Sequence, residues 1–503
     1  MSLSDLTRRR GVAERKLEMV VMNRTHSHAA LLRASVLEWS GEVAGLMLQL
    51  GTIRAIDCGR ITRRAALGVG SLGVVGLSLA DLLQMQAAAA SEKSPRAKSI
   101  ILLWLWGGPS HLDTFDMKPK APVQYRGPYA PIATKTAGIQ ICELLPQLAR
   151  QSDRYALIRS LHCSSNDHGI AGTIGLTGSE SGGASLGGQV QAGAVKPAHG
   201  AVVSKALGFD PVMPRFVSVG GRLHQGKKPI SGEGGGGLGG LHDPFRLDYD
   251  PLEGVKLPQL DLLEGQSVAG LSGRRSLRES LDDVARSFDR WPQMERFDQF
   301  RQQAFSLLTS PAARQVFDVE REPADLRARY GRFRFGQCCL MARRLIEAGV
   351  RFVQVNWSSH VEPVEDTGDG GWDMHDRNFQ QLQDRHAWML DQSLSALLDD
   401  LDQRGLLAET IVVAVGEFGR TPKINERAGR DHWQQCYSAL VAGGGLRVGQ
   451  VVGESDAKGE FPANRPVTPA DLFHTLLTQI GIGTTQLTAA GITPQGELIE
   501  ELI

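Results

Sequence analysis

The sequence predicts an α/β protein with a mostly parallel, doubly wound sheet flanked by helices. Short apolar runs, each ended by turn residues, alternate along the chain with segments of helical periodicity. Such alternation is typical of parallel strands joined by helices that cover both faces of the sheet. Acidic residues and histidines follow directly after several of the apolar runs, which is where ligands bind in open α/β sheets.

Strands are expected where the sequence is continuously apolar, because the side chains of such a run can be buried on both faces of a sheet. The first run, SIILLWLW at 99–106, ends in GGPS, as a buried strand stopped by a turn does. The same pattern recurs in YALIRSL, RFVSV, RFVQVNW, TIVVAVG and YSALVAG, at 155–161, 215–219, 351–357, 410–416 and 437–443.

Helices are expected between these strands. The segment 386–407 places leucines at helical spacing on one face and acidic residues on the other. Thr468 is expected to cap the N-terminus of a later helix, with Pro469 in its first position. A charged stretch from Arg274 to Val319 predicts further helix, within a helical insertion at about 270–330.

A leader-like segment precedes the first strand. Arg63 and Arg64 are followed by an uncharged, glycine-rich run at 65–80 and by small residues at 87–90. This layout predicts a twin-arginine export signal over 47–90. A core helix or a membrane anchor is the alternative, but the run is too short and too rich in glycine to cross a hydrocarbon core of about 30 Å.

Export signals do not normally follow a long preceding segment. We therefore interpret residues 1–46 as an over-extended gene start, expected to be disordered, with Met47 as the natural start. Cleavage of the signal would leave a domain over 91–503. The expected partner during export is the twin-arginine translocase, the expected location is periplasmic or extracellular, and no stable membrane span is predicted.

The charge balance argues against nucleic acid as a partner. Lysine plus arginine and aspartate plus glutamate are both 55, so the formal net charge is zero. None of the six cysteines belongs to a C-x-x-C pair, which argues against a cysteine-based zinc site.

The polar clusters at the expected strand ends predict a metal site. Several carboxylates and imidazoles in one pocket would repel one another or lose hydration unless cations neutralise them. Mixed oxygen and nitrogen ligands suit zinc, manganese, iron or calcium, and two ions about 4 Å apart suit phosphoryl or sulfuryl transfer. The clusters comprise His111 and Asp113, Asp167 and His168, Asp373 and His375, Glu417 and Arg420, and Asp431 and His432.

Each cluster also has a simpler interpretation. Asp167 could be only an N-cap, with His168 in the first helical turn. Asp373 and His375 could belong to a solvated loop. Arg420 could bind a substrate phosphate or sulfate, or form an ordinary salt bridge.

Taken in order, the motifs resemble a known family. The twin-arginine leader, LLWLWGGPSHLDTFD, NDHGIAGTIGLTG, GWDMHDRNF, VGEFGRTPKIN and GRDHW look like those of the exported DUF1501 proteins, over essentially the whole chain from Met47. These proteins are similar in layout to the alkaline phosphatase and sulfatase superfamily. The resemblance implies a central sheet with metal ligands and a nucleophile at the strand ends.

Position by position, the resemblance implies individual roles. The helix ending in Leu176, Thr177 and Gly178 places His168 where the superfamily has its nucleophile, so His168 could be a nucleophile, a metal ligand or an acid-base group. Ser164 and Ser165 are alternative nucleophiles. The implied metal ligands are His111, Asp113, Asp373, His375, Glu417 and His432, with His168, Asp167 and Arg420 as catalytic candidates.

The predicted function is therefore an exported metal-dependent hydrolase. Its expected substrate is a small-molecule or polysaccharide ester of phosphate or sulfate, and its expected cofactors are two divalent metal ions. The alternative is a non-catalytic, metal-stabilised envelope or binding protein with the same fold.

Overall fold

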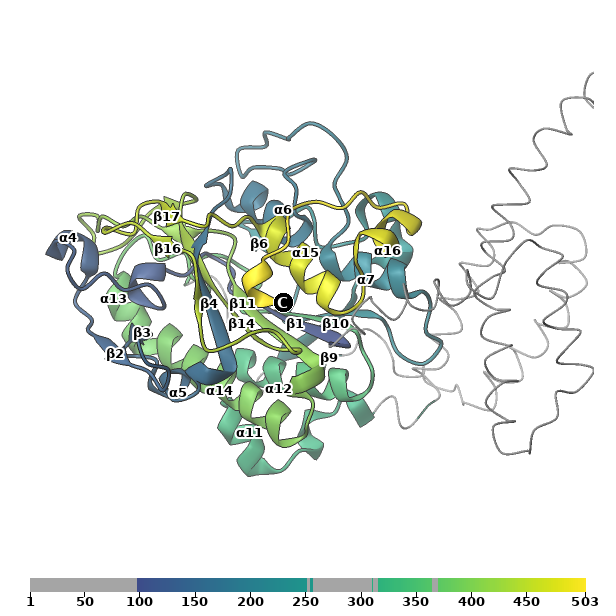
Figure 1. Cartoon of the computed structure of the whole chain (residues 1–503). Helices are drawn as coiled ribbons and strands as arrows, with labels where there is room; N and C mark the ends of the chain where they lie inside the picture. The colour runs from purple at the N-terminus through teal and green to yellow at the C-terminus, as the bar shows by residue number, and fades with distance from the viewer. Residues whose placement is uncertain (1–96, 251–253, 257–309, 311–314, 364–369) are drawn as a thin grey trace, which may run out of the picture. The chain divides into compact units, whose positions relative to one another are not determined.

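A computed structural model describes residues 97–250, 254–256, 310, 315–363 and 370–503 (Figure 1). Within these residues the chain forms a central nine-stranded sheet. In order across the sheet, the strands are β15 (Val451–Val452), β4 (Tyr155–Leu161), β14 (Tyr437–Gly443), β11 (Thr410–Val415), β1 (Ser99–Trp104), β10 (Phe352–Asn356), β5 (Phe216–Val219), β8 (Phe245–Asp250) and β9 (Gly254–Lys256).

The middle of the sheet is parallel, as predicted. β1 pairs in parallel with β11 on one side and β10 on the other, placing Ile100 opposite Ile411 and Phe352. The parallel pairing continues through β5 to β8. β14 is the exception in this region, because it runs antiparallel to both β11 and β4. The apolar runs thus predicted the strands correctly, but not the direction of β14.

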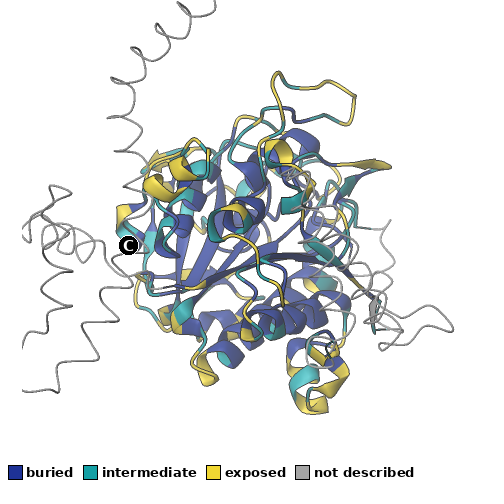
Figure 2. Cartoon of the chain, turned by 90° about the vertical axis from the view of Figure 1, so that its right-hand side faces the viewer, coloured by how far each residue is buried: buried dark blue, intermediate teal, exposed yellow. Residues whose placement is uncertain are grey.

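Helices cover both faces of the sheet (Figure 1). The side chains of β1 alternate between two hydrophobic cores, with Ile101 and Leu103 in one and Ile100, Leu102 and Trp104 in the other. The first core packs against α5 (Pro146–Ala149), α11 (Ala324–Tyr330), α12 (Arg334–Glu347) and α14 (Ala387–Gln403). The second packs against α6 (His168–Thr177), α7 (His199–Leu207), α15 (Pro469–Gln479) and α16 (Thr484–Ala489). Figure 2 shows the buried strands between helices whose outer faces are exposed.

The smaller elements lie around this sheet. Two short helices are α4 (Val123–Arg126) and α13 (Asn378–Gln381). Four two-stranded ribbons pair β2 (Pro131–Ala133) with β3 (Gln140–Cys142), β6 (His224–Gln225) with β7 (Lys228–Pro229), β12 (Gly419–Arg420) with β13 (His432–Trp433), and β16 (Glu454–Ser455) with β17 (Pro462–Asn464).

The predicted helix signals are confirmed where the structure describes them. Thr468 caps α15 in a reciprocal capping box with Asp471, and Pro469 occupies the first turn. The leucine-rich segment forms α14.

Other predictions fall wholly or partly outside the described residues. The predicted leader at 1–46 and signal at 47–90 lie outside them, and so does most of the predicted helical insertion. Of that insertion, a short 3-10 helix at Val319–Arg321 and α11 are described. No helix in the described part of the chain is long and apolar enough to span a bilayer.

Candidate metal centre

Three segments that follow parallel-oriented strands meet at one edge of the sheet. The first is the N-terminus of α6, shortly after β4, which carries His168. The second is the loop after β10, which carries Asp373 and His375. The third is the β12–β13 ribbon after β11, which carries His432. This is the position that open α/β sheets use for ligands.

One oxygen atom, Asp373 Oδ1, lies at the centre of the cluster. The Nε2 atoms of His168, His375 and His432 lie 3.3, 3.0 and 3.1 Å from it. The Nε2 atoms of His375 and His432 are themselves 2.9 Å apart. The structure therefore brings together four residues that the sequence placed in three separate motifs.

The opposite nitrogen of each ring faces a hydrogen-bond acceptor. His168 Nδ1 lies 2.6 Å from Glu417 Oε1 and His375 Nδ1 lies 2.8 Å from Asp431 Oδ1. His432 Nδ1 lies 2.7 Å from the carbonyl oxygen of Asn166. With hydrogen on each Nδ1, as these acceptor oxygens require, a neutral ring has its lone pair at Nε2, on the side that faces Asp373; His168, whose pKa is raised, must first lose its Nε2 proton. Histidines that bind metal ions commonly donate their other ring N–H to a carboxylate or a backbone carbonyl in this way, which fixes the orientation of the ring.

The pKa values in the cluster are shifted by its buried carboxylates and by the groups that neutralise them. Burial opposes ionisation of Asp373, but Arg420 and the neighbouring imidazoles outweigh it and hold its pKa far below the usual range. Burial also opposes protonation of His168, yet the carboxylates of Asp373 and Glu417 raise its pKa to about 9. Burial lowers the pKa of His432 to about 4. The cluster thus holds carboxylate charge that a cation or a proton must balance.

These residues fit a divalent metal ion. His168, Asp373 and His432 each offer a ligand atom, and the three atoms lie within 4.8 Å of one another. In a tetrahedral site with bonds of about 2.0 to 2.1 Å, the ligand atoms lie about 3.3 Å apart, close to the distances around Asp373. His375 Nε2 contacts two of the three and is the candidate fourth ligand. Among the described residues this is the one group with such geometry, so a second ion has no comparable site there.

Glu417 lies behind His168 instead of among the ligand atoms. Its carboxylate is fully buried, and both of its oxygens accept the Gly107 N–H, at 3.0 and 3.3 Å. Its Oε1 also receives His168 Nδ1. Glu417 therefore lies on the far side of the His168 ring from the Nε2 atoms around Asp373, where its carboxylate orients His168.

The guanidinium of Arg420 is buried against backbone carbonyls. Its Nε donates to Gly108 O at 2.9 Å, and its other nitrogens donate to the carbonyls of Gly107 and Arg430. One Nη2 also lies 2.6 Å from Asp373 Oδ1. Its donors are thereby used within the protein, which corresponds to the salt-bridge interpretation and not to a substrate contact.

Asp167 caps α6. Its Oδ1 accepts the N–H groups of Gly169 and Ile170 at 3.0 and 3.2 Å, and its Oδ2 accepts the N–H of Leu186. These contacts correspond to the N-cap interpretation. The two serines are engaged locally as well: Ser164 donates to Glu180, and Ser165 Oγ accepts the Asp167 N–H.

The structure does not bring His111 and Asp113 into the contacts around Asp373. Both carboxylate oxygens of Asp113 are bound by Arg430, and one also receives the amide of Asn378. His111 Nε2 lies 2.9 Å from the carbonyl of Gly459. The expectation that every cluster converges on one pocket is therefore wrong for this pair: Asp113 is paired with Arg430 and Asn378, and His111 Nε2 contacts the Gly459 carbonyl, while His111 Nδ1 is buried without a hydrogen-bond partner among the described residues.

Two contributors were not among the predicted site residues. Asp431 was noted in the GRDHW motif, but only its histidine was assigned a role. Asn166 contributes through its backbone carbonyl, for which the residue type gives no signal.

Comparisons with known proteins agree with the motif resemblance. The family model described as "Protein of unknown function (DUF1501)" matches residues 97–502. No curated protein matches the sequence.

Several solved structures are distantly similar. The PsFucS1 sulfatase from Pseudoalteromonas sp. is 12% identical with a TM-score of 0.35, covering 82% of this chain and 74% of that one. The phosphonate monoester hydrolase SpPMH from Silicibacter pomeroyi is 12% identical with a TM-score of 0.33, covering 77% and 73%. The lipoteichoic acid synthase LtaP from Listeria monocytogenes is 12% identical with a TM-score of 0.33, covering 78% and 73%. Similarity at this level carries no inference about activity.

Proposed function

Because the chain belongs to the DUF1501 family, whose description names no activity, we propose a function from the site itself: an exported, metal-dependent hydrolase of phosphate or sulfate esters. The single observation that carries the proposal is the convergence of three imidazole Nε2 atoms on Asp373 Oδ1, each ring held by an acceptor at Nδ1. The class of ester follows from the motif resemblance around Leu176 to Gly178.

In this proposal some residues bind the metal ion and others hold the metal-binding rings in orientation. A divalent cation, when bound, would polarise an ester oxygen and stabilise the charge that develops on it. His168, His432 and Asp373 are the proposed ligands, with His375 as the fourth. Glu417, Asp431 and the Asn166 carbonyl hold the rings in orientation. Since His168 Nε2 faces Asp373, we propose His168 as a ligand and not as the nucleophile.

Water is the proposed nucleophile. The hydroxyls of Ser164 and Ser165 take part in local hydrogen bonds. The cluster is open on the side of His375, whose side chain is 34% exposed, whereas that of His168 is 1% exposed. Solvent and substrate would therefore approach from the His375 side.

The local hydrogen bonds of Ser164 and Ser165 also favour the second candidate, a non-catalytic metal-stabilised envelope or binding protein. The alkaline phosphatase and sulfatase superfamily, which the motifs resemble, uses a side-chain nucleophile at the start of the helix that corresponds to α6. In this chain that position is His168. Binding without turnover would fit a site from which the nucleophile is missing.

Metal content and turnover measured on the same preparation distinguish the two candidates. The purified full chain is assayed by inductively coupled plasma mass spectrometry and with 4-nitrophenyl phosphate, phenylphosphonate and sulfate esters. The hydrolase proposal expects about one equivalent of metal and turnover of at least one ester, both lost in Asp373→Asn. Asp376→Asn, at a neighbouring aspartate whose side chain is 49% exposed, is the matched control and should retain both. Metal without turnover of any ester supports the binding protein, and no metal in the wild type contradicts both.

Export is a separate proposal. The paired arginines at 63 and 64, followed by an uncharged run, support recognition by the twin-arginine translocase and release into the periplasm or beyond.

A further inference from the structure

A second concave site lies at the opposite end of α6 from the metal centre. The cavity has a volume of about 430 Å³, within the range of small-molecule sites. Thr177 and Gly178, at the C-terminal end of α6, contribute to its wall, together with residues of α7, α15 and the C-terminal segment. His168 begins the same ten-residue helix, so about 15 Å of helix separates the cavity from the metal cluster.

One wall of the cavity is apolar. It is formed by side chains of α7, α15 and α16 and of the loops that face them. The residues are Val202, Leu238, Phe473, Leu477, Leu487 and Ile492. Such a wall favours the hydrocarbon part of a ligand over water.

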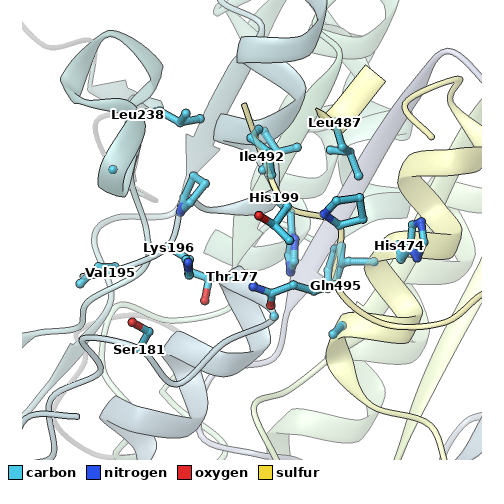
Figure 3. A pocket seen from close by; sticks show the side chains of 18 of the residues that line it. Thr177, Ser181, Val195, Lys196, His199, Leu238, His474, Leu487, Ile492 and Gln495 are labelled. Carbon is cyan, nitrogen blue, oxygen red and sulfur yellow. The ribbon is translucent and has the colours of Figure 1, made fainter. Parts of the chain in front are cut away.

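The cavity is lined by basic residues and by no acidic ones. Lys196 and His474 line it, and none of the lining residues is an aspartate or glutamate (Figure 3). No hydrogen bond or ion pair joins Lys196 to another described residue, so its ammonium remains available. His474 Nδ1 lies 2.8 Å from the carbonyl of Gly496, which leaves its Nε2 for another contact. An anionic group is therefore favoured here over a cation.

His199 adds a buried polar group. It is 6% exposed, and its ring stacks on Phe473 with centroids 3.7 Å apart. The ring contacts the carbonyl of Gly175, while Nε2 has no hydrogen-bond partner among the described residues. Burial lowers the pKa of His199 to about 3, so at neutral pH Nε2 is an acceptor without a donor. A buried acceptor of this kind is costly unless a ligand or water supplies a donor.

We propose that this cavity binds a small amphipathic organic acid that also carries a hydroxyl group. Its carboxylate pairs with Lys196, and its hydrocarbon part packs on the apolar wall. The hydroxyl supplies the donor that His199 lacks. The site is distinct from the metal centre and does not depend on the proposed hydrolase activity.

Calorimetric titration of the full chain with matched six-carbon probes tests the proposal. Hexanoate should bind more tightly than hexan-1-ol or hexylamine, and 6-hydroxyhexanoate should bind more tightly than hexanoate. Lys196→Met should weaken hexanoate about three- to tenfold through loss of the charge-assisted contact, and should leave hexan-1-ol unchanged. Lys205→Met is the matched control, because Lys205 is an exposed lysine of α7 that does not line the cavity.

A variant that fills the cavity locates the binding. Ile492→Trp should abolish binding of hexanoate while leaving the metal content unchanged. Four results would overturn the proposal: no heat of binding at millimolar hexanoate, equal affinity for hexylamine and hexanoate, 6-hydroxyhexanoate binding no more tightly than hexanoate, or full hexanoate binding by Ile492→Trp. None of these results bears on the metal centre, so failure here is distinguishable from failure of the hydrolase proposal.

Discussion

Arg430 and Asp113 form a buried, two-point ion pair between segments 317 residues apart. Arg430 Nε lies 2.6 Å from Asp113 Oδ2, and Nη2 lies 3.0 Å from Oδ1. The remaining donors of the guanidinium bind the carbonyls of Tyr125, Thr421 and Pro422. Arg430 directly precedes Asp431 and His432, so the pair fixes the backbone that presents these residues to the cluster around Asp373.

Breaking this pair should destabilise the protein strongly. Asp113→Asn leaves a buried guanidinium without its counter-charge, which typically costs about 3 to 5 kcal/mol. Urea denaturation monitored by circular dichroism measures the change in free energy of unfolding. Asp153→Asn is the control, because the Lys135–Asp153 pair is exposed and is expected to contribute at most about 1 kcal/mol. Equal effects of the two substitutions would contradict a special role for Asp113.

Neutralising Glu417 should weaken metal binding without removing a ligand. Glu417→Gln keeps an acceptor for His168 Nδ1 but removes the charge that increases the basicity of the ring. The expected loss of metal affinity is about 10- to 100-fold, measured by competition with a chelating dye. Glu409→Gln, at a surface residue paired with Lys98, should leave the affinity unchanged. Complete loss of metal by Glu417→Gln would instead indicate that Glu417 is itself a ligand.

A methyl group at position 175 should displace α6. A Cβ built on Gly175 would lie 2.3 Å from the Trp104 ring, and Trp104 is fully buried. Gly175→Ala is therefore expected to cost about 1 to 3 kcal/mol through overpacking, despite the better helix propensity of alanine. Thermal unfolding followed by fluorescence provides the measurement. Gly237→Ala, where an added Cβ has nothing within 4 Å, is the control. A stabilised Gly175→Ala variant would show that the close approach is not limiting.

His199 should make stability depend on pH. Its folded-state pKa of about 3 lies below the unfolded value, so the unfolded chain binds a proton first as the pH falls. Stability is therefore lost from about pH 6.5 downward, by about 2 kcal/mol at pH 5 for this group. His199→Phe retains an aromatic ring and should reduce the loss measured by urea denaturation between pH 7 and pH 5. Identical pH dependence in variant and wild type would show that His199 is not the cause.

Export should depend on the paired arginines. Replacing Arg63 and Arg64 together by lysine retains charge but removes the guanidinium pair that we expect the translocase to recognise. The protein should then remain in the cytoplasmic fraction, as followed by immunoblot of fractionated cells. Replacement of Arg54 by lysine, in the same n-region, should not affect export. Unchanged export of the double variant would contradict the twin-arginine proposal.

The sequence predicts the sheet better than it predicts the site. Buried parallel strands need apolar residues on both faces, so their positions are visible in the sequence. The direction of β14 depends on its connection and not on its composition, and it was not predicted. Asp113 was assigned to the metal because its partner, Arg430, is remote in sequence and carries no local signal. The three histidines that gather around Asp373 were all among the predicted site residues, because they belong to polar clusters that follow apolar runs and to motifs that the family resemblance marks.

The segments that supply the cluster are far apart along the chain, and this determines when the cluster can form. His168, Asp373 and His432 belong to three segments, and the last two lie 59 residues apart. Binding of the proposed cation would therefore be a late event in folding, after the long loops between these segments have closed. The proposed ion would then act as a cross-link that joins three segments brought together only by the finished sheet.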